Sequence, residues 1–127
     1  VGSKDDVIAL VLARHAERAR RAAAEPTDSA LFARIAEVVV DDPTTGRLLA
    51  GMLLDGIPIT DLQGEFPLLD RLATSDGDTR AALTYALALG WEVFGPSLLA
   101  AVDARPTSDE LCRELERAMT SIARPGA

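Results

Sequence analysis

The stretch 78-DTRAALTYALALGWEVFGPSLLAAV-102 decides the fold class of this chain. Its apolar residues fall on every side of a helix, and they do not alternate with polar residues at the period of two that marks a strand. A helix that is apolar nearly all round belongs to a core or to an interface rather than to the surface of a monomer. The stretch therefore predicts a long, partnered helix, bent where the ring of Pro96 clashes with the carbonyl of Glu92.

The sequence before this stretch also predicts helices. Ser3 is a suitable N-cap for a helix over about 3–24, and a second helix spans about 28–41. A third helix begins with Asp42 as N-cap and Pro43 in the first turn, and it ends at Gly56, a natural left-handed C-cap. The N-terminal half is thus predicted to be helical throughout.

Proline and glycine interrupt the segment 57–74, where we expect two short helical pieces, near Asp61 and over 67–73, followed by a turn. After the long apolar stretch, Thr107 and Glu110 form a capping box that opens a last amphipathic helix. Six principal helices and no strands predict an all-α helical bundle.

Composition limits the functions that the chain can perform. With 127 residues, 48% of them hydrophobic and 26% charged, the chain is long and apolar enough for one domain with a core. A net charge of −7 repels phosphate backbones, so these residues are expected to bind DNA poorly. The single cysteine, Cys112, suits a reducing cytoplasm, and we expect no apolar run of membrane-spanning length.

Five basic residues gather in the first 21 positions: Lys4, Arg14, Arg18, Arg20 and Arg21. One interpretation is a solvated helix face that pairs with Glu17 and Glu25. The other is that this end of the chain faces a nucleic-acid-binding domain. The sequence leaves both open.

No catalytic constellation is visible, so we expect no enzyme, cofactor or metal site. His15 lies beside apolar positions of the first helix, where a structural role is favoured over a ligand contact. Cys112 in the last helix is expected to be inert.

Two sequence patterns resemble the TetR family of bacterial transcriptional regulators. Residues 2-GSKDDVI-8 are similar to the start of the helix that follows the family's helix-turn-helix domain, although Val1 stands where a Phe is usual. Residues 63-QGEFPLLDRL-72, 81-AAL-83 and 89-LGWEVF-94 are similar to regulatory domains from high-GC bacteria. The resemblance implies that 1–25 is a linking helix after an absent DNA-binding domain, and that 26–127 is a ligand-binding and dimerisation domain.

The resemblance further implies a homodimer in which the last two helices of each subunit form a four-helix bundle. The excess apolar surface of the 78–102 stretch agrees with such a partner. The residues expected in the interface are Ala81, Ala88, Leu98, Leu111, Leu115, Ala118, Met119 and Ile122.

A small hydrophobic effector in a cavity among the middle helices would, by the same resemblance, shift the linking helix between two arrangements. The candidate lining residues are Met52, Phe66, Leu69, Thr84, Tyr85, Leu89, Trp91 and Phe94. Thr84 and Tyr85 supply polar anchors, while Trp91 suits the dimer interface equally well. Such a lining favours a neutral or weakly polar ligand.

The sequence thus favours the regulatory domain of a TetR-like repressor, with DNA bound through a separate N-terminal domain. The alternative is a helical homodimeric interaction module without a small-molecule ligand. A cavity of several hundred Å³ would favour the first, and a solid core the second.

Overall fold

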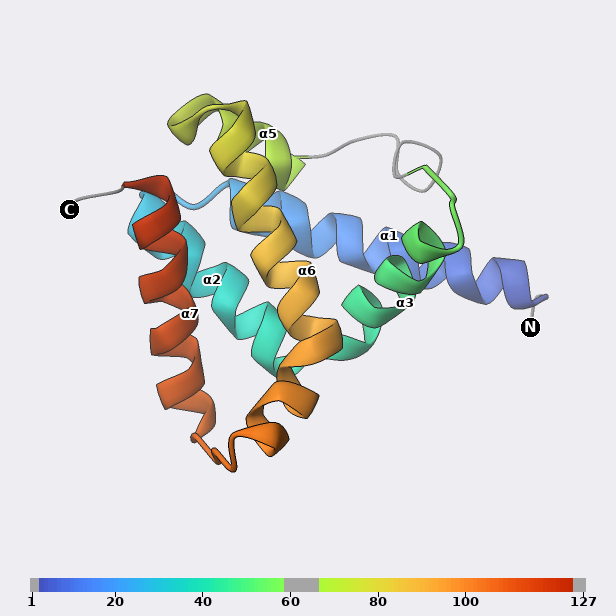
Figure 1. Ribbon diagram of the computed structural model, residues 1–127. Coiled ribbons are helices and arrows are strands. Elements are labelled where there is room, and N and C mark those ends of the chain that lie inside the picture. The colour runs from blue at the N-terminus through green and yellow to red at the C-terminus, as the bar shows by residue number, and fades with distance from the viewer. Residues whose placement is uncertain (1–2, 59–66, 125–127) are drawn as a thin grey trace.

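The computed structural model describes residues 3–58 and 67–124, and within them every regular element is a helix (Figure 1). The helices are α1 (Lys4–Ala23), α2 (Asp28–Asp41), α3 (Pro43–Leu54), α5 (Pro67–Asp76), α6 (Asp78–Ala101) and α7 (Ser108–Ala123). The predicted all-α fold with six principal helices is confirmed. The short helix expected near Asp61 lies outside the described residues.

Side-chain caps fix several of the helix boundaries. Ser3 accepts a hydrogen bond from the backbone N–H of Asp6, whose carboxylate accepts one from the N–H of Ser3, completing a capping box. Thr107 caps α7 by accepting from the N–H of Glu110 at 3.1 Å. Gly56 adopts a φ of 88°, which confirms the left-handed end expected for the third helix.

Two boundaries differ from the sequence prediction. α5 continues through Ser75 to Asp76, where a turn was expected. Within it, the hydroxyl of Thr74 donates to the carbonyl of Asp70 at 2.9 Å. Asp42 stands at the N-cap position of α3 but makes no side-chain capping bond. Its carboxylate pairs instead with Arg18 of α1.

The core forms around α2, which lies between α7 on one side and α1, α5 and α6 on the other (Figure 1). Leu31 and Phe32 of α2 are fully or almost fully buried, as are Leu72 of α5 and Met119 of α7. Burial of each such side chain stabilises the fold by about 1.5–3 kcal/mol. These side chains form a hydrophobic core within the single chain.

Arg71 of α5 fastens the end of α1 to this core. Its Nη1 donates to the carbonyls of Ala23 at 2.8 Å and Glu25 at 2.7 Å, and its Nη2 lies 3.4 Å from the carboxylate of Asp28. Asp28 also accepts from Arg124 at 2.6 Å, beyond the end of α7. One arginine thus satisfies carbonyls that the end of a helix leaves free.

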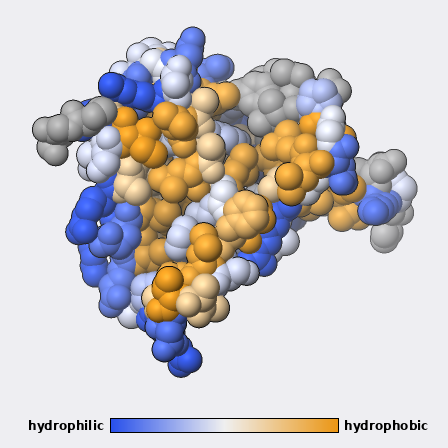
Figure 2. Space-filling model, viewed as in Figure 1, coloured by the Kyte–Doolittle hydropathy of each residue, from blue (hydrophilic) through white to orange (hydrophobic). Residues whose placement is uncertain are grey.

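Most of α6 is uncovered, although it is the most apolar segment of the chain. Its buried residues are Ala81, Thr84, Glu92 and Gly95, whereas Phe94 and Leu98 are 59% and 57% exposed. Figure 2 shows hydrophobic surface across the face formed by α6 and α3, with the hydrophilic side of α7 at its edge. By length and composition alone α6 could cross a membrane, so the expectation that no segment is long and apolar enough is wrong.

Candidate functional site

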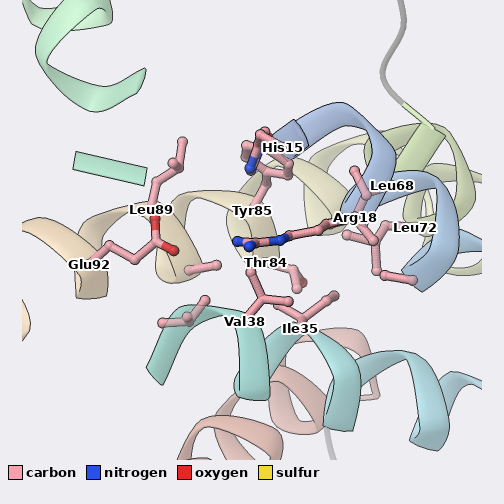
Figure 3. Close-up of a pocket in the computed structure, with 14 residues that line it drawn as sticks. His15, Arg18, Ile35, Val38, Leu68, Leu72, Thr84, Tyr85, Leu89 and Glu92 are labelled. Carbon is pink, nitrogen blue, oxygen red and sulfur yellow. The ribbon is translucent and has the colours of Figure 1, made fainter. Parts of the chain in front are cut away.

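A cavity of about 50 Å³ lies where α1, α2, α5 and α6 meet (Figure 3). The residues that line it are His15, Arg18, Ala19, Ala22, Ile35, Val38, Val39, Leu68, Leu72, Thr84, Tyr85, Ala88, Leu89 and Glu92. Most of them are aliphatic, because the inward faces of α2 and α5 also build the core. The cavity is therefore a gap in the hydrophobic core with a few polar groups on its wall.

α1 forms one wall of this cavity through His15, Arg18, Ala19 and Ala22. Any molecule that enlarges the cavity must therefore press on α1 as well as on the core helices. Such contact is the physical requirement for a ligand to favour one position of that helix over another.

The polar side chains on the cavity wall include one with a hydrogen-bond partner and two whose pKa values are shifted by burial. Thr84 is buried, and its hydroxyl donates to the carbonyl of Arg80 at 2.9 Å. Burial lowers the pKa of His15 below its usual value, helped by the positive charge of Arg18 and opposed by Asp42. Burial and the nearby carboxyl of Glu92 raise the pKa of Tyr85 to about 12. Both rings are thus neutral at pH 7.

Glu92 is 6% exposed, and the sequence analysis did not identify it as a site residue. Burial, reinforced by Asp42 and opposed by Arg47, raises the pKa of its carboxyl to about 8. A sequence signal for it exists, since Glu92 is the one charged residue in the otherwise uncharged segment 81–102. Because burying a charged group costs free energy, an acidic residue in the middle of an apolar helix indicates a functional or structural site.

Only some of the residues predicted to line a ligand cavity line this one. Thr84, Tyr85 and Leu89 line the cavity, whereas Phe94 is exposed and Phe66 lies outside the described residues. Met52 of α3 and Leu69 of α5 are half-buried and do not line the cavity, and α5 contributes Leu68 and Leu72 to the wall instead. The periodicity of α5 identified the correct helix but not the side that faces the cavity.

Trp91 does not line the cavity, although it borders a neighbouring groove that shares Val39 and Glu92 with it. Trp91 also lines an open groove of about 460 Å³ beside the connection between α6 and α7, and its ring lies over Gly95. A role for Trp91 in ligand binding or in a dimer interface therefore stays a prediction.

The residues predicted for the dimer interface also fall into two groups, those in the core of the single chain and those at its surface. Ala81, Leu115 and Met119 are 1%, 6% and 1% exposed in the single chain, so they form its own core and cannot also meet a partner. Ala88 and Leu111 pack against that core, and Ala118 and Ile122 are half-buried. Leu98 alone of the predicted set is a large exposed side chain. The apolar stripe of α7 faces α2 instead of solvent because α2 supplies the matching apolar face.

The volume of the cavity is far below the 300–1,000 Å³ usual for drug-sized ligands. In this arrangement it holds a few water molecules or a very small ligand. Across residues 3–58 and 67–124, His, Cys, Asp and Glu side chains form no group of three able to hold a metal ion.

Known proteins relate the chain to transcriptional regulation. A helix-turn-helix (HTH)-type transcriptional repressor of Mycobacterium tuberculosis (strain H37Rv) is 41% identical over 90 residues, covering 63% of this chain and 48% of the relative. The chain is a distant homologue of mycobacterial HTH-type transcriptional regulators. Regulators from Mycobacterium bovis and from M. tuberculosis strain CDC 1551 match equally well. The chain spans about half the length of these relatives, and no family model and no solved structure matches it.

Proposed function

We propose that this chain is the effector-sensing and dimerising part of a TetR-like transcriptional repressor that acts in the cytoplasm. The observation that carries the proposal is the 41% identity to an HTH-type repressor over 90 residues. In this proposal residues 1–25 are the linking helix, residues 26–127 sense and dimerise, and a separate HTH domain binds DNA. The net charge of −7 agrees with DNA binding by a separate domain, because negative charge opposes binding to phosphates.

The cavity supports the sensing role because α1 is one of its walls. A small hydrophobic molecule that enters must widen the space between α1 and α6, since the present volume is about 50 Å³. Its differential affinity for the wide and the narrow arrangement then shifts the position of α1. Repression changes because α1 leads toward the DNA-binding domain.

The exposed face of α6 supports the dimer. Leu83, Phe94, Leu98 and Val102 are each more than half exposed, and a run of large apolar side chains in water is typical of a surface that a partner covers. A second copy of α6 would cover it with like chemistry around a twofold axis. The interface proposed here is centred on α6, in contrast to the one expected from the sequence, which was shared with the apolar stripe of α7.

The test joins this chain to an HTH head that represses a reporter only as a dimer. We expect repression by the wild-type fusion, its loss with Phe94→Glu and Leu98→Glu, and none of that loss with Leu54→Glu, an exposed leucine of α3. Sedimentation of the untagged chain without detergent should give a dimer at micromolar concentration. A stable monomer, or a chain that stays with membranes, would contradict the proposal.

A helical interaction module without a ligand remains the second candidate, and the small cavity favours it. Both candidates require the dimer. They differ in whether any small molecule binds between α1 and α6 and relieves repression by the fusion protein.

A further inference from the structure

We propose that the cavity takes a ligand with a short apolar body and a cationic ammonium group, and that the carboxyl group of Glu92 receives this cation. The inference rests on the proposed sensing function and adds a chemical class to it. It replaces the neutral or weakly polar ligand that the sequence favoured.

The first support is the way in which the fold makes room for this carboxyl group. Glu92 reaches from α6 toward α3, and its carboxyl group lies directly against Gly46. A Cβ atom at position 46 would overlap it, so any other residue there would displace the acid. Figure 3 shows the carboxyl group directed toward the interior of the ring of lining residues. The helix pair is thus shaped around an acidic group at the cavity wall.

The second support is that, within residues 3–58 and 67–124, the nearest basic groups bond elsewhere than to this carboxyl group. Arg47 directs its Nε to the backbone oxygen of Glu92, 2.9 Å away, rather than to the carboxylate. Arg18 pairs with Asp42. A nearly buried carboxyl group to which the nearest basic groups do not bond has a large capacity for a positive hydrogen-bond donor.

The aliphatic residues of the cavity wall determine which apolar body the ligand can have. Ile35, Val38 and Leu68 offer aliphatic surface on the side away from Glu92, and this surface suits an alkyl body. The volume of about 50 Å³ limits that body to a few carbon atoms unless the helices move apart. An anionic ligand would meet the carboxyl group of Glu92, and the one arginine on the wall, Arg18, is already paired with Asp42.

The ionisation of Glu92 can be followed between pH 7 and pH 9, because the two neighbouring rings do not change charge there. The groups that face Glu92 are His15 and Arg18 from α1, Asp42 from the α2–α3 junction, Arg47 from α3 and Tyr85 from α6. The lowered pKa of His15 and the pKa of about 12 of Tyr85 keep both neutral at pH 7 and at pH 9. With a pKa of about 8, Glu92 goes from about one-tenth to about nine-tenths ionised over the same interval.

The experiment titrates the chain with three probes of equal length, butylammonium, butan-1-ol and butanoate, at pH 7 and pH 9. NMR shifts of His15, Thr84 and Tyr85 report binding in the cavity. We expect butylammonium to bind most tightly and to gain about tenfold in affinity at pH 9, where an alkylammonium is still protonated. Glu92→Gln should remove both the preference and the pH dependence. Gly46→Ala should weaken butylammonium binding, whereas Gly51→Ala, an open position of the same helix, should not.

The outcomes separate this inference from the proposed function. Equal affinities for butylammonium and butan-1-ol, or a Glu92→Gln variant that keeps the preference for the amine, would overturn the role of Glu92 and leave an apolar sensing cavity. If none of the three probes shifts the cavity signals at either pH, the cation site is refuted, while the reporter fusion still tests whether a larger molecule relieves repression. Repression by the reporter fusion would still test dimerisation independently of any ligand.

Discussion

Arg47 of α3 donates its Nε–H to the backbone oxygen of Glu92 in α6 at 2.9 Å. This carbonyl is the one that Pro96 leaves without a helical donor, because proline has no N–H to return to the residue four positions before it. The arginine therefore replaces a hydrogen bond that the sequence of α6 removes. It also joins α3 to α6 at the residue whose carboxyl group faces the cavity.

This replacement predicts a coupling between positions 47 and 96. Arg47→Met should lower the free energy of unfolding by about 1 kcal/mol, because a backbone acceptor loses its partner. Pro96→Ala supplies an N–H for the same carbonyl, so it should stabilise the Arg47→Met variant by about 1 kcal/mol more than it stabilises the wild type. Urea unfolding of the four proteins measures this difference. Additive effects of the two substitutions would show that Arg47 and Pro96 do not act on the same carbonyl.

The two helical glycines of α3 provide a matched pair. Alanine at either position gains about 0.5–1 kcal/mol of helix propensity. At Gly51 nothing lies within 4 Å of an added Cβ, so Gly51→Ala should be stabilising. At Gly46 the added Cβ overlaps the Glu92 carboxyl group, so Gly46→Ala should be destabilising by about 1–3 kcal/mol. Thermal unfolding compares the two, and a stabilised Gly46→Ala protein would mean that Glu92 can leave this position freely.

Glu92 also predicts how stability depends on pH. Its folded pKa of about 8 exceeds the usual value of 4.5, so between these two values the native state holds a proton that the unfolded state has released. The free energy of unfolding contributed by Glu92 must therefore fall as pH rises from about 4.5 to about 8, and it stays constant above that range. Relative to Glu92→Gln, the wild type should lose about 2–5 kcal/mol between pH 4.5 and pH 8.5.

Denaturation of both proteins across this interval checks the prediction. The difference between them removes the contributions of other titrating groups, such as His15 and Asp76, since both proteins contain them. Parallel stability curves for the wild type and Glu92→Gln would mean that the carboxyl group titrates as it does in water.

Helix positions were predictable because local signals are strong here: Ser3 and Thr107 at N-caps, and Gly56 at a left-handed end. The packing partners were not predictable to the same degree. The apolar stripe of α7 shows that one face is buried, but not whether α2 or a second chain buries it. Leu115 and Met119 were therefore assigned to an interface although they belong to the core.

The cavity shows the same limit. Leu68 and Leu69 are adjacent and chemically identical, and only the rotation of α5 against α1 decides that Leu68 lines the wall. Glu92 was missed for the opposite reason, since its isolation in an apolar helix is a sequence signal that points to a site. His15 was expected to be structural, yet it lies on the cavity wall.

Gly95 and Gly90 of α6 predict contrasting effects on the fluorescence of Trp91. A Cβ at position 95 would fall 2.5 Å from the indole ring, whereas at position 90 it meets nothing within 4 Å. Gly95→Ala should therefore move the ring and shift its emission, while Gly90→Ala should leave emission unchanged and stabilise the helix by about 0.5–1 kcal/mol. An unshifted spectrum in Gly95→Ala would place the indole elsewhere.

We expect the replacement of Arg71 to lower the stability of the fold strongly, because this side chain joins α5 to the end of α1. Arg71→Met removes the donor to the carbonyls of Ala23 and Glu25 and leaves Asp28 with one cation fewer, which should lower the free energy of unfolding by about 2–3 kcal/mol. The matched control is Arg34→Met, because Arg34 makes exposed ion pairs worth at most about 0.5 kcal/mol. Hydrogen exchange should also show earlier opening at the C-terminal end of α1 in Arg71→Met but not in Arg34→Met, since the carbonyls that Arg71 holds are the ones that fix that end to α5. Equal stability of the two variants would mean that α1 is held by its apolar contacts alone, and a ligand in the cavity would then need to overcome only those contacts to move it.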